Sequence, residues 1–436
     1  EIPERKDGMS SFIKPLKKAR RSNQEEIDLA FGNKEGIPVL PAVVFARSCQ
    51  PLRDGNGKLM KVNIPEDVFY HQMLITGRTG SGKTVSMKYM AQYFLENLKD
   101  KDGPGAVLAV NVKEEDMLTM DKKSITENED IKKEWSDLGF EPHGVKTFRI
   151  YYPGNKIPNY SDKVDFKKCE KITLMTKHID PETLTGLIQN ISEKGADQLP
   201  TIFRYWQEEN PDGKLKDFIV YFADEEKKRT YQGLNTVGDE LEIKMFYSTW
   251  QNVLNALTNA TEYFDVKGAK ELKAEDILQH GKMSVIDVTV KHSFGFGSVL
   301  LRDLLDKIYE AKSNKEINVP ILIIIDEVHE FYNSGRSREA LQTLDAICRK
   351  GRSLKIGVIF SSQNPEDIPK GINSVVNTKI YFKSEPHNIR SLGIDMSGFD
   401  SEAFKKGYAA VRIHGLSQLR FVKFPLSLAG VNDEKR

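Results

Sequence analysis

The sequence is poor in cysteine and lacks any metal-type arrangement of it. Only three cysteines occur among 436 residues, Cys49, Cys169 and Cys348, and their spacing fits neither a zinc motif nor a disulfide framework. This pattern indicates a reducing compartment, and we expect a cytoplasmic protein whose cysteines are core or neutral positions. A disulfide-stapled secreted scaffold is excluded.

Long apolar runs are also missing. The run Ile321–Ile325 is bounded by Pro320 and Asp326, whereas a bilayer span requires roughly 20 apolar residues. No secretory signal is visible near the first residues. The sequence therefore predicts neither a membrane-spanning helix nor a membrane partner.

The net charge is close to zero, because the chain has 64 basic and 63 acidic residues. A global positive field is excluded, so any contact with DNA must come from a local surface. One basic cluster stands near the N-terminus and comprises Lys14, Lys17, Lys18, Arg20 and Arg21. Such a cluster is either a DNA-binding arm or a solvated tail, and the pattern favours the tail.

One glycine-rich segment fits a phosphate-binding loop. It consists of Gly77, Arg78, Thr79, Gly80, Ser81, Gly82, Lys83, Thr84 and Val85, which matches the spacing GxxxxGK[ST]. Glycines allow successive N–H groups to face a phosphate, and the helix that follows adds the positive end of its dipole. An apolar strand precedes the loop and a helix is expected over 85–98. We predict that Lys83 reaches the β- and γ-phosphates of ATP and that Thr84 binds Mg²⁺.

A second motif delivers two carboxylates from the end of a buried strand. Ile321–Ile325 is apolar at every position, as expected at the centre of a parallel sheet, and ligands bind at the carboxyl ends of such strands. Asp326 is predicted to hold Mg²⁺. Glu327 is predicted to orient and deprotonate the attacking water. The two motifs together predict ATP hydrolysis.

The order of predicted elements indicates an α/β fold. Strands are expected over 106–112, 148–152, 283–288, 356–361, 378–382 and 408–413, the last paired with 419–424. Alternation with helices predicts a mostly parallel central sheet with antiparallel strands added at its edge. We divide the chain into a flexible basic segment (1–35), a short β-rich element (36–66), an ATPase core in two parts (67–164 and 281–425) and a C-terminal tail (426–436).

The segment 165–280 separates the two parts of the core and is predicted to be a helical insertion. A helix is expected to begin at Asp180-Pro181 and to bury Leu184, Leu187, Ile188 and Ile191, which follow helical spacing. Trp206 and Trp250 are interpreted as core residues of this subdomain rather than as platforms for bases.

A third group of residues follows the carboxylate strand. A helix end carries Arg349 and Arg352, and the strand after it ends in Ser362-Gln363-Asn364-Pro365. With the phosphate loop and the segment 326–331, these residues resemble the HerA/FtsK superfamily of ring-shaped, ATP-driven DNA translocases, and specifically its HerA-like branch. The resemblance covers roughly residues 68 to 425. It implies a RecA-like P-loop fold.

The resemblance also implies roles for the third group. Arg352, or failing that Arg349, would be an arginine finger that reaches the γ-phosphate bound by a neighbouring subunit, and Gln363 would sense that phosphate. A finger acting in trans implies a homo-hexamer. DNA would pass through a central pore on loops that touch its backbone. The candidates are 291–295 and 333–338, including Arg336 and Arg338, which could equally be ordinary solvated residues.

The chain departs from the HerA pattern in three places. HerA proteins carry an aspartate and a Gly-Glu pair after the second strand, whereas this chain has Asn111 and then Lys113-Glu114-Glu115. Asn364 replaces the arginine that follows the sensor glutamine. About 65 residues precede the motor, fewer than a complete HerA N-terminal barrel contains, and that barrel is where a partner nuclease docks.

The leading hypothesis is a Mg²⁺-dependent hexameric ATPase that pumps double-stranded DNA. End processing, genome packaging, plasmid transfer and defence remain open as biological settings. One alternative is a motor of a secretion or conjugation channel. Another is a nucleotide-gated scaffold without sustained turnover, against which the pair Glu327 and Arg352 argues.

Overall fold

The computed structural model describes residues 4–5, 13–14, 23–31, 35–45, 48–155, 157–187, 192–289, 294–328, 338–364, 375–384, 404–414 and 419–433. Most of the basic N-terminal cluster, His329, Arg336 and residues 291–293 lie outside these ranges, and the side chain of Arg338 is likewise not described. None of the described helices is long and apolar enough to cross a bilayer.

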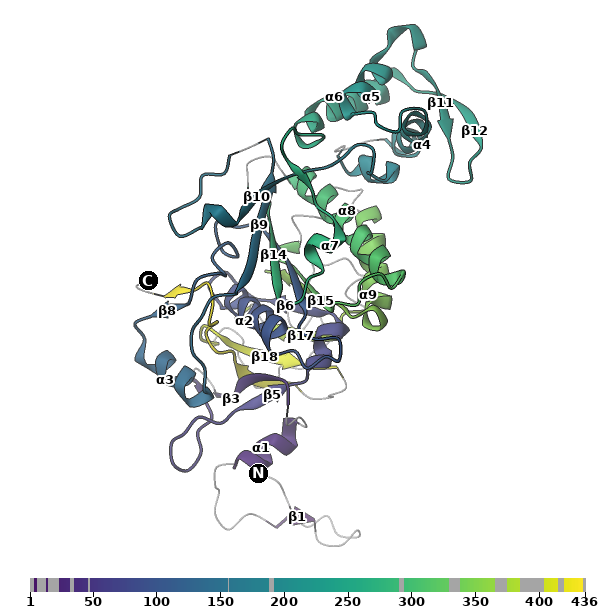
Figure 1. Ribbon diagram of the computed structural model, residues 1–436. Coiled ribbons are helices and arrows are strands. Elements are labelled where there is room, and N and C mark those ends of the chain that lie inside the picture. The colour runs from purple at the N-terminus through teal and green to yellow at the C-terminus, as the bar shows by residue number, and fades with distance from the viewer. Residues whose placement is uncertain are drawn as a thin grey trace.

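One mixed sheet of 14 strands organises the described part of the chain (Figure 1). Its strands are β3 (Ile37–Phe45), β4 (Ser48–Pro51), β5 (Val62–Ile64), β6 (Met73–Thr76), β7 (Ala106–Asn111), β9 (Thr147–Pro153), β10 (Cys169–Thr173), β13 (Lys270–Glu271), β14 (Lys282–Asp287), β15 (Ile321–Ile325), β16 (Ile356–Ser362), β17 (Thr378–Tyr381), β18 (Tyr408–Arg412) and β19 (Arg420–Lys423). The parallel part follows the order β13-β10-β9-β14-β7-β15-β16-β6-β17. Antiparallel β18, β19, β3 and β4 continue it on one side, and β5 pairs with β3. The predicted fold class is confirmed.

The central strands are buried on both faces, which explains their unbroken apolar sequences. In β15, Ile321, Ile323 and Ile325 join one hydrophobic cluster, while Leu322 and Ile324 join the other. Alternate residues of a strand point to opposite faces. Both faces must therefore be covered by other elements, as in other parallel sheets.

Different helices cover the two faces. Helix α2 (Lys83–Glu96) packs Met87, Met90 and Phe94 into one cluster. Helices α8 (Phe294–Ser313) and α9 (Arg338–Leu354) pack against each other and fill the other cluster, with Leu304 and Ile347 fully buried. The carboxyl ends of the central strands remain uncovered by this packing, and the predicted phosphate loop lies there.

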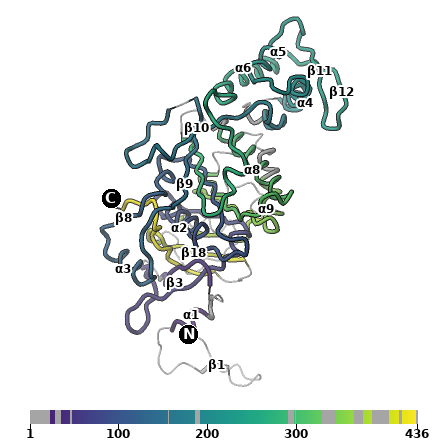
Figure 2. The backbone as a smooth tube through the Cα atoms, in the orientation of Figure 1, coloured from purple at the N-terminus to yellow at the C-terminus, as the bar shows by residue number. Residues whose placement is uncertain are grey.

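A lobe extends from the sheet between Leu174 and Asp265 (Figures 1 and 2). It holds α4 (Glu193–Glu209), α5 (Leu215–Ala223), α6 (Tyr247–Ala260) and a hairpin of β11 (Thr230–Leu234) and β12 (Glu240–Lys244). The prediction that Trp206 and Trp250 are core residues is confirmed. Trp206 is buried, and the half-buried Trp250 donates its indole N–H to the carbonyl of Phe222 at 3.0 Å.

The boundaries differ from the sequence prediction in several places. Strands β10 and β13 lie within 165–280 but belong to the main sheet, so the lobe is narrower than the predicted insertion. The segment after Asp180 is a 3₁₀ helix, η3 (Pro181–Leu187), rather than the start of a long α-helix. Leu184 is buried as predicted, and Ile188 and Ile191 lie outside the described residues.

Two short elements lie in the segments predicted as a flexible N-terminal segment and a C-terminal tail. Helix α1 (Gln24–Phe31) lies within the segment expected to be flexible, and its Ile27 packs into the core beside β5. Near the C-terminus, β20 (Asn432–Asp433) pairs in parallel with β8 (Ile125–Thr126). Pairing with β8 attaches the end of the chain to the core, next to the site described below.

Candidate active site

The loop between β6 and α2 is shaped by glycine. Gly82 has φ of 111°, and a Cβ there would lie 2.9 Å from the backbone nitrogen of Gly407. No other residue fits this position without displacing the chain. Gly82 also stands at the N-cap of α2, where no side chain caps the helix. The first N–H groups of α2 therefore face the pocket, which is the arrangement that binds phosphate.

Lys83 extends its ammonium back along this loop. Its Nζ donates to the carbonyls of Gly77 and Arg78, and only 6% of the residue is exposed. Burial lowers the pKa of Lys83, and the charges of Glu327 and Asp326 oppose that shift. The lysine is thus a buried cation surrounded by oxygen atoms that an anionic phosphate can replace.

Asp326 and Glu327 follow β15 at the same edge of the sheet. The backbone N–H of Glu327 donates to Asp326 Oδ1 at 2.9 Å, and Asp326 is 5% exposed. Burial raises the pKa of Asp326, because a carboxylate loses solvation there. A cation beside this oxygen would remove that penalty.

Glu327 is held by cationic and amide donors. Its backbone adopts φ of 44°, a conformation that non-glycine residues rarely adopt and that is concentrated at functional sites. Its Oε1 forms an ion pair with Lys113 Nζ and accepts from Gln363 Nε2 at 3.3 Å. Burial raises the pKa of Glu327, but the charges of Lys113 and Lys83 and the Gln363 amide outweigh it, so the net pKa is lowered.

Asn111 fixes the loop that presents Lys113. Its Nδ2 donates to the Glu114 carbonyl at 2.8 Å and to Asp287 Oδ1 at 3.1 Å, and its Oδ1 accepts from the Met117 N–H at 3.0 Å. Asp287 also accepts from Tyr160 at 2.7 Å. Asn111 and the Glu114 backbone, two of the departures from the HerA pattern, therefore belong to one polar network.

These groups converge on a pocket of about 430 Å³. The phosphate loop, α2, the two carboxylates, Lys113 and the C-terminal residues 430–433 line it. Sequence reasoning missed Lys113, Lys406 and the C-terminal residues. The only signal for Lys113 was its departure from the family pattern, and the two-residue strand β20 carries no periodic signal.

Comparison with known proteins finds partial sequence matches and a broader likeness in fold. No protein-family profile matches the chain. The chain is similar to the DNA double-strand break repair helicase HerA of Saccharolobus solfataricus, with 27% identity over 121 residues, 26% of this chain and 24% of that protein. HerA of Pyrococcus furiosus is 36% identical over 64 residues, 15% of this chain and 12% of its own length. The matches thus span a quarter or less of these relatives.

Solved structures extend the similarity to most of the fold. VirB4 of Thermoanaerobacter pseudethanolicus superimposes with a TM-score of 0.55 at 12% identity, covering 90% of this chain and 97% of that one. The plasmid coupling protein TrwB, solved with a non-hydrolysable ATP analogue, gives 0.53 at 11% identity, with 91% and 96% covered. The fold is that of P-loop ATPases such as VirB4 and TrwB, and the short sequence matches to HerA support a P-loop ATPase of HerA/FtsK type.

The candidate arginine fingers lie far from the phosphate loop of the same chain. Arg352 is in the last turn of α9, just before β16 begins, whereas Ser362 at the other end of β16 pairs with Thr76 beside the loop. Seven strand residues span roughly 20 Å. Arg349 forms an ion pair with Asp345 one turn earlier on α9, at 2.7 Å. Arg352 therefore stands at the end of β16 that is remote from the phosphate loop of its own chain.

The oxygen donors of the site fit Mg²⁺. Thr84 and Asp326 line the same pocket, and a hydroxyl and a carboxylate are ligands that this hard cation accepts when phosphates and water complete its shell. Among the described residues no cluster of three or more His, Cys, Asp or Glu forms a separate metal cage.

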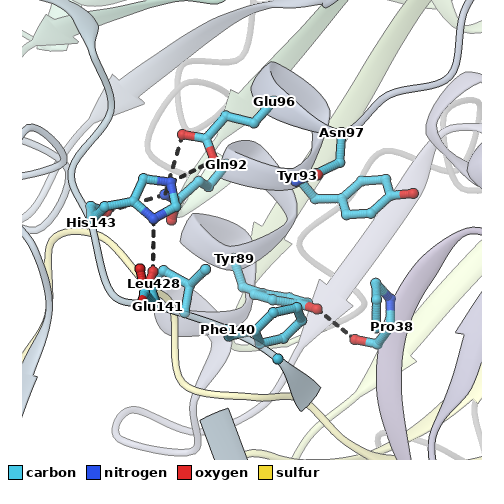
Figure 3. A pocket seen from close by; sticks show the side chains of 11 residues that line it. Pro38, Tyr89, Gln92, Tyr93, Glu96, Asn97, Phe140, Glu141, His143 and Leu428 are labelled. Carbon is cyan, nitrogen blue, oxygen red and sulfur yellow. Dashed lines mark hydrogen bonds and ion pairs between the residues drawn. The ribbon is translucent and has the colours of Figure 1, made fainter. Parts of the chain in front are cut away.

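A second pocket of about 400 Å³ lies along the outer side of α2 (Figure 3). His143 pairs there with Glu96 at 2.8 Å and donates from Nδ1 to the Glu141 carbonyl at 2.7 Å, while Tyr89 donates to the Pro38 carbonyl at 2.6 Å. These polar groups bond to one another. Neither the phosphate loop nor the strand-end carboxylates line this pocket. The candidate site for nucleotide chemistry is therefore the first pocket.

Proposed function

We propose that this chain binds and hydrolyses ATP with Mg²⁺. The observation that carries the proposal is the convergence of Lys83, Asp326 and Glu327 in one pocket at the carboxyl edge of the sheet. A phosphate cradle alone would serve a binding protein. The Glu327 carboxylate beside it, whose lowered pKa keeps it ionised, can accept a proton from the attacking water.

Each residue has a defined part in the reaction. The loop N–H groups and Lys83 bind the β- and γ-phosphates and neutralise charge that develops on them. Thr84 and Asp326 would hold Mg²⁺, which, when bound, shields the phosphate oxygens and lowers the barrier to attack. Glu327 orients a water molecule and takes its proton. Gln363, bonded to Glu327, would report the state of the γ-phosphate.

Two substitutions test this proposal. Lys83→Ala should abolish both ATP binding and turnover, because the phosphates lose their buried cation. Glu327→Gln should reduce turnover by roughly 100-fold or more while ATP binding remains, because an amide cannot take the proton. Steady-state phosphate release and equilibrium binding of a fluorescent ATP analogue measure the two effects. Wild-type protein that binds ATP but never turns over would leave the nucleotide-gated scaffold as the function.

We further propose that the chain assembles as a hexameric ring and moves double-stranded DNA through its pore. Similarity to HerA, named as a DNA double-strand break repair helicase, and the distance of Arg352 from its own phosphate loop support this proposal. DNA should stimulate ATP turnover, and nucleotide should stabilise a ring in native mass spectrometry. A particle that stays monomeric with nucleotide and ignores DNA would contradict it.

A motor of a conjugation or secretion channel is the second candidate. Its support is the fold similarity to TrwB, described as a bacterial conjugative coupling protein, over 98% of this chain with a TM-score of 0.54. Stimulation of turnover by a protein substrate but not by DNA would favour this candidate over the translocase.

A further inference from the structure

We propose that Lys113 is a switch residue whose ammonium alternates between Glu327 and the terminal phosphate of the bound triphosphate. The inference rests on the proposed ATPase function and assigns Lys113 the task of distinguishing ATP from ADP. In the structure its Nζ is paired with Glu327 Oε1. With a triphosphate bound, the same Nζ would donate to a γ-phosphate oxygen and release the carboxylate for water.

The first argument is the crowding of Glu327 Oε1. That oxygen accepts both from Lys113 Nζ and from Gln363 Nε2. A carboxylate oxygen engaged by two donors is a poor acceptor for a proton from water. Glu327 is also 2% exposed, so its oxygen cannot exchange Lys113 for bulk solvent. Release of Glu327 is therefore favoured when another anion in the pocket binds Lys113.

The second argument is the position of the Lys113 side chain. It lines the nucleotide pocket together with Lys83 and Asp326, and it is 43% exposed, unlike its partner. The charge of Lys113 contributes to the lowered pKa of Lys83, after the larger effect of burial, so the two ammonium groups feel each other. An anion placed between two cations relieves this repulsion, and the γ-phosphate is the anion that the pocket is built to receive.

The third argument is that the backbone holds still while the side chain can move. Asn111 bonds the Glu114 carbonyl and the Met117 N–H, which fixes both sides of the short loop around Lys113. Glu114 adopts φ of 39°, a constrained backbone conformation. A lysine side chain ends in a compact charge on a flexible stem of four carbons, whose single bonds can rotate. Rotation of these bonds moves Nζ without unfolding the loop.

Equilibrium binding of ADP and of a non-hydrolysable ATP analogue, each with Mg²⁺, tests the switch. In Lys113→Met the preference for the triphosphate over ADP should fall about 10- to 100-fold, the effect of one charge-assisted hydrogen bond. Lys113→Arg should keep most of the preference because it retains the charge. Lys168→Met is the matched control, since Lys168 pairs with Asp121 at 2.9 Å and does not line the pocket. An unchanged preference in Lys113→Met would overturn the switch.

A double-substitution cycle gives an independent readout. Glu327→Gln removes the anion that competes for Lys113, so it should tighten binding of the ATP analogue. The gain should disappear in the Lys113→Met background, because no ammonium is left to transfer. An equal gain in both backgrounds would mean that Lys113 only clamps Glu327. These binding measurements do not depend on turnover. Wild-type protein that fails to hydrolyse ATP would contradict the proposed function, whereas the role of Lys113 would still be decided by the binding measurements.

Discussion

At the scale of single residues, the site depends on neighbours that provide no chemistry themselves. Asn111 contacts neither phosphate nor water in the proposed reaction, yet its amide joins Asp287 to the loop that carries Lys113. Asp287 is fully buried and also accepts from Thr289 at 2.9 Å and from Tyr160. The Asn111 side-chain amide suits this position because its Nδ2 donates to Asp287 and the Glu114 carbonyl, while its Oδ1 accepts from the Met117 N–H.

Asn111→Asp tests this requirement at the position where HerA proteins carry aspartate. The new carboxylate would face buried Asp287 in place of a donor, so one of the two carboxyl groups must bind a proton in the folded state. An acid that must stay protonated destabilises the fold above its unfolded pKa, and the penalty fades as pH falls toward it. We expect a loss of about 1–3 kcal/mol at pH 8 and a smaller loss at pH 5, measured by urea unfolding.

Asn128→Asp is the matched control. Asn128 caps α3 (Glu129–Leu138) through a bond from the Asp130 N–H at 3.0 Å, and aspartate caps helices equally well. It should lose little stability at either pH. Equal losses at pH 8 and pH 5 in Asn111→Asp would show that charge repulsion is not the cause.

At the scale of elements, the C-terminal residues form one wall of the nucleotide pocket. The Gly430 carbonyl accepts from Lys88 Nζ at 2.6 Å and from Thr119 at 3.2 Å. Lys88 lies on α2, one turn beyond the phosphate loop, and burial lowers its pKa to about 8. The C-terminal segment thus satisfies a buried lysine on the helix that binds phosphate, and we expect it to support nucleotide binding.

Gly430→Val should weaken nucleotide binding as well as stability. Gly430 has φ of 72°, and a Cβ there would lie 3.0 Å from Met120 Sδ and 3.2 Å from Met120 Cα, so the wall must shift. Gly238→Val is the matched control, because Gly238 has φ of 92° with nothing within 4 Å and lies in the distant hairpin. Both variants should lose about 1–2 kcal/mol in thermal unfolding from backbone strain. Only Gly430→Val should raise the Kd for an ATP analogue; an equal Kd in both would refute a role for this wall.

The elements also show which parts of the fold are predictable from sequence. The run Ile321–Ile325 and the glycine spacing before Lys83 specify β15 and the phosphate loop locally, because burial on both faces and close phosphate contact each restrict the residue types. The pairing of β10 and β13 with the main sheet depends on contacts across about 100 residues of lobe, and short polar strands lack periodicity. Lys113 had no recognisable motif, since its partner Glu327 is 214 positions away.

At the scale of the whole molecule, the phosphate loop and the proposed arginine finger lie at opposite ends of the parallel strands. The phosphate loop, Asp326 and Glu327 lie at the carboxyl edge, while Arg352 lies at the opposite end of β16. One chain cannot bring them together without breaking the sheet. A ring of identical chains can, because a head-to-tail interface places one edge of each subunit against the other edge of its neighbour.

Mixing two inactive variants tests this arrangement directly. Lys83→Ala lacks the phosphate cation and Arg352→Ala lacks the proposed finger, so each alone should lose at least about 100-fold in turnover. In an equimolar mixture, an interface that joins the loop of an Arg352→Ala subunit to the arginine of a Lys83→Ala subunit is intact. About a quarter of randomly formed interfaces have this composition, so turnover should recover to about a quarter of the wild-type rate if sites act independently.

The same mixture made with Arg349→Ala decides between the two arginines. Arg349 is paired with Asp345 on its own helix, and Arg352 stands one turn nearer to β16. If Arg352 is the finger, Arg349→Ala alone should retain most of its turnover and mixing should add little. Recovery in the Arg349→Ala mixture would assign the finger to that residue instead. A failure of both mixtures, in subunits that native mass spectrometry shows to exchange within one ring, would mean that neither arginine completes a neighbour's site.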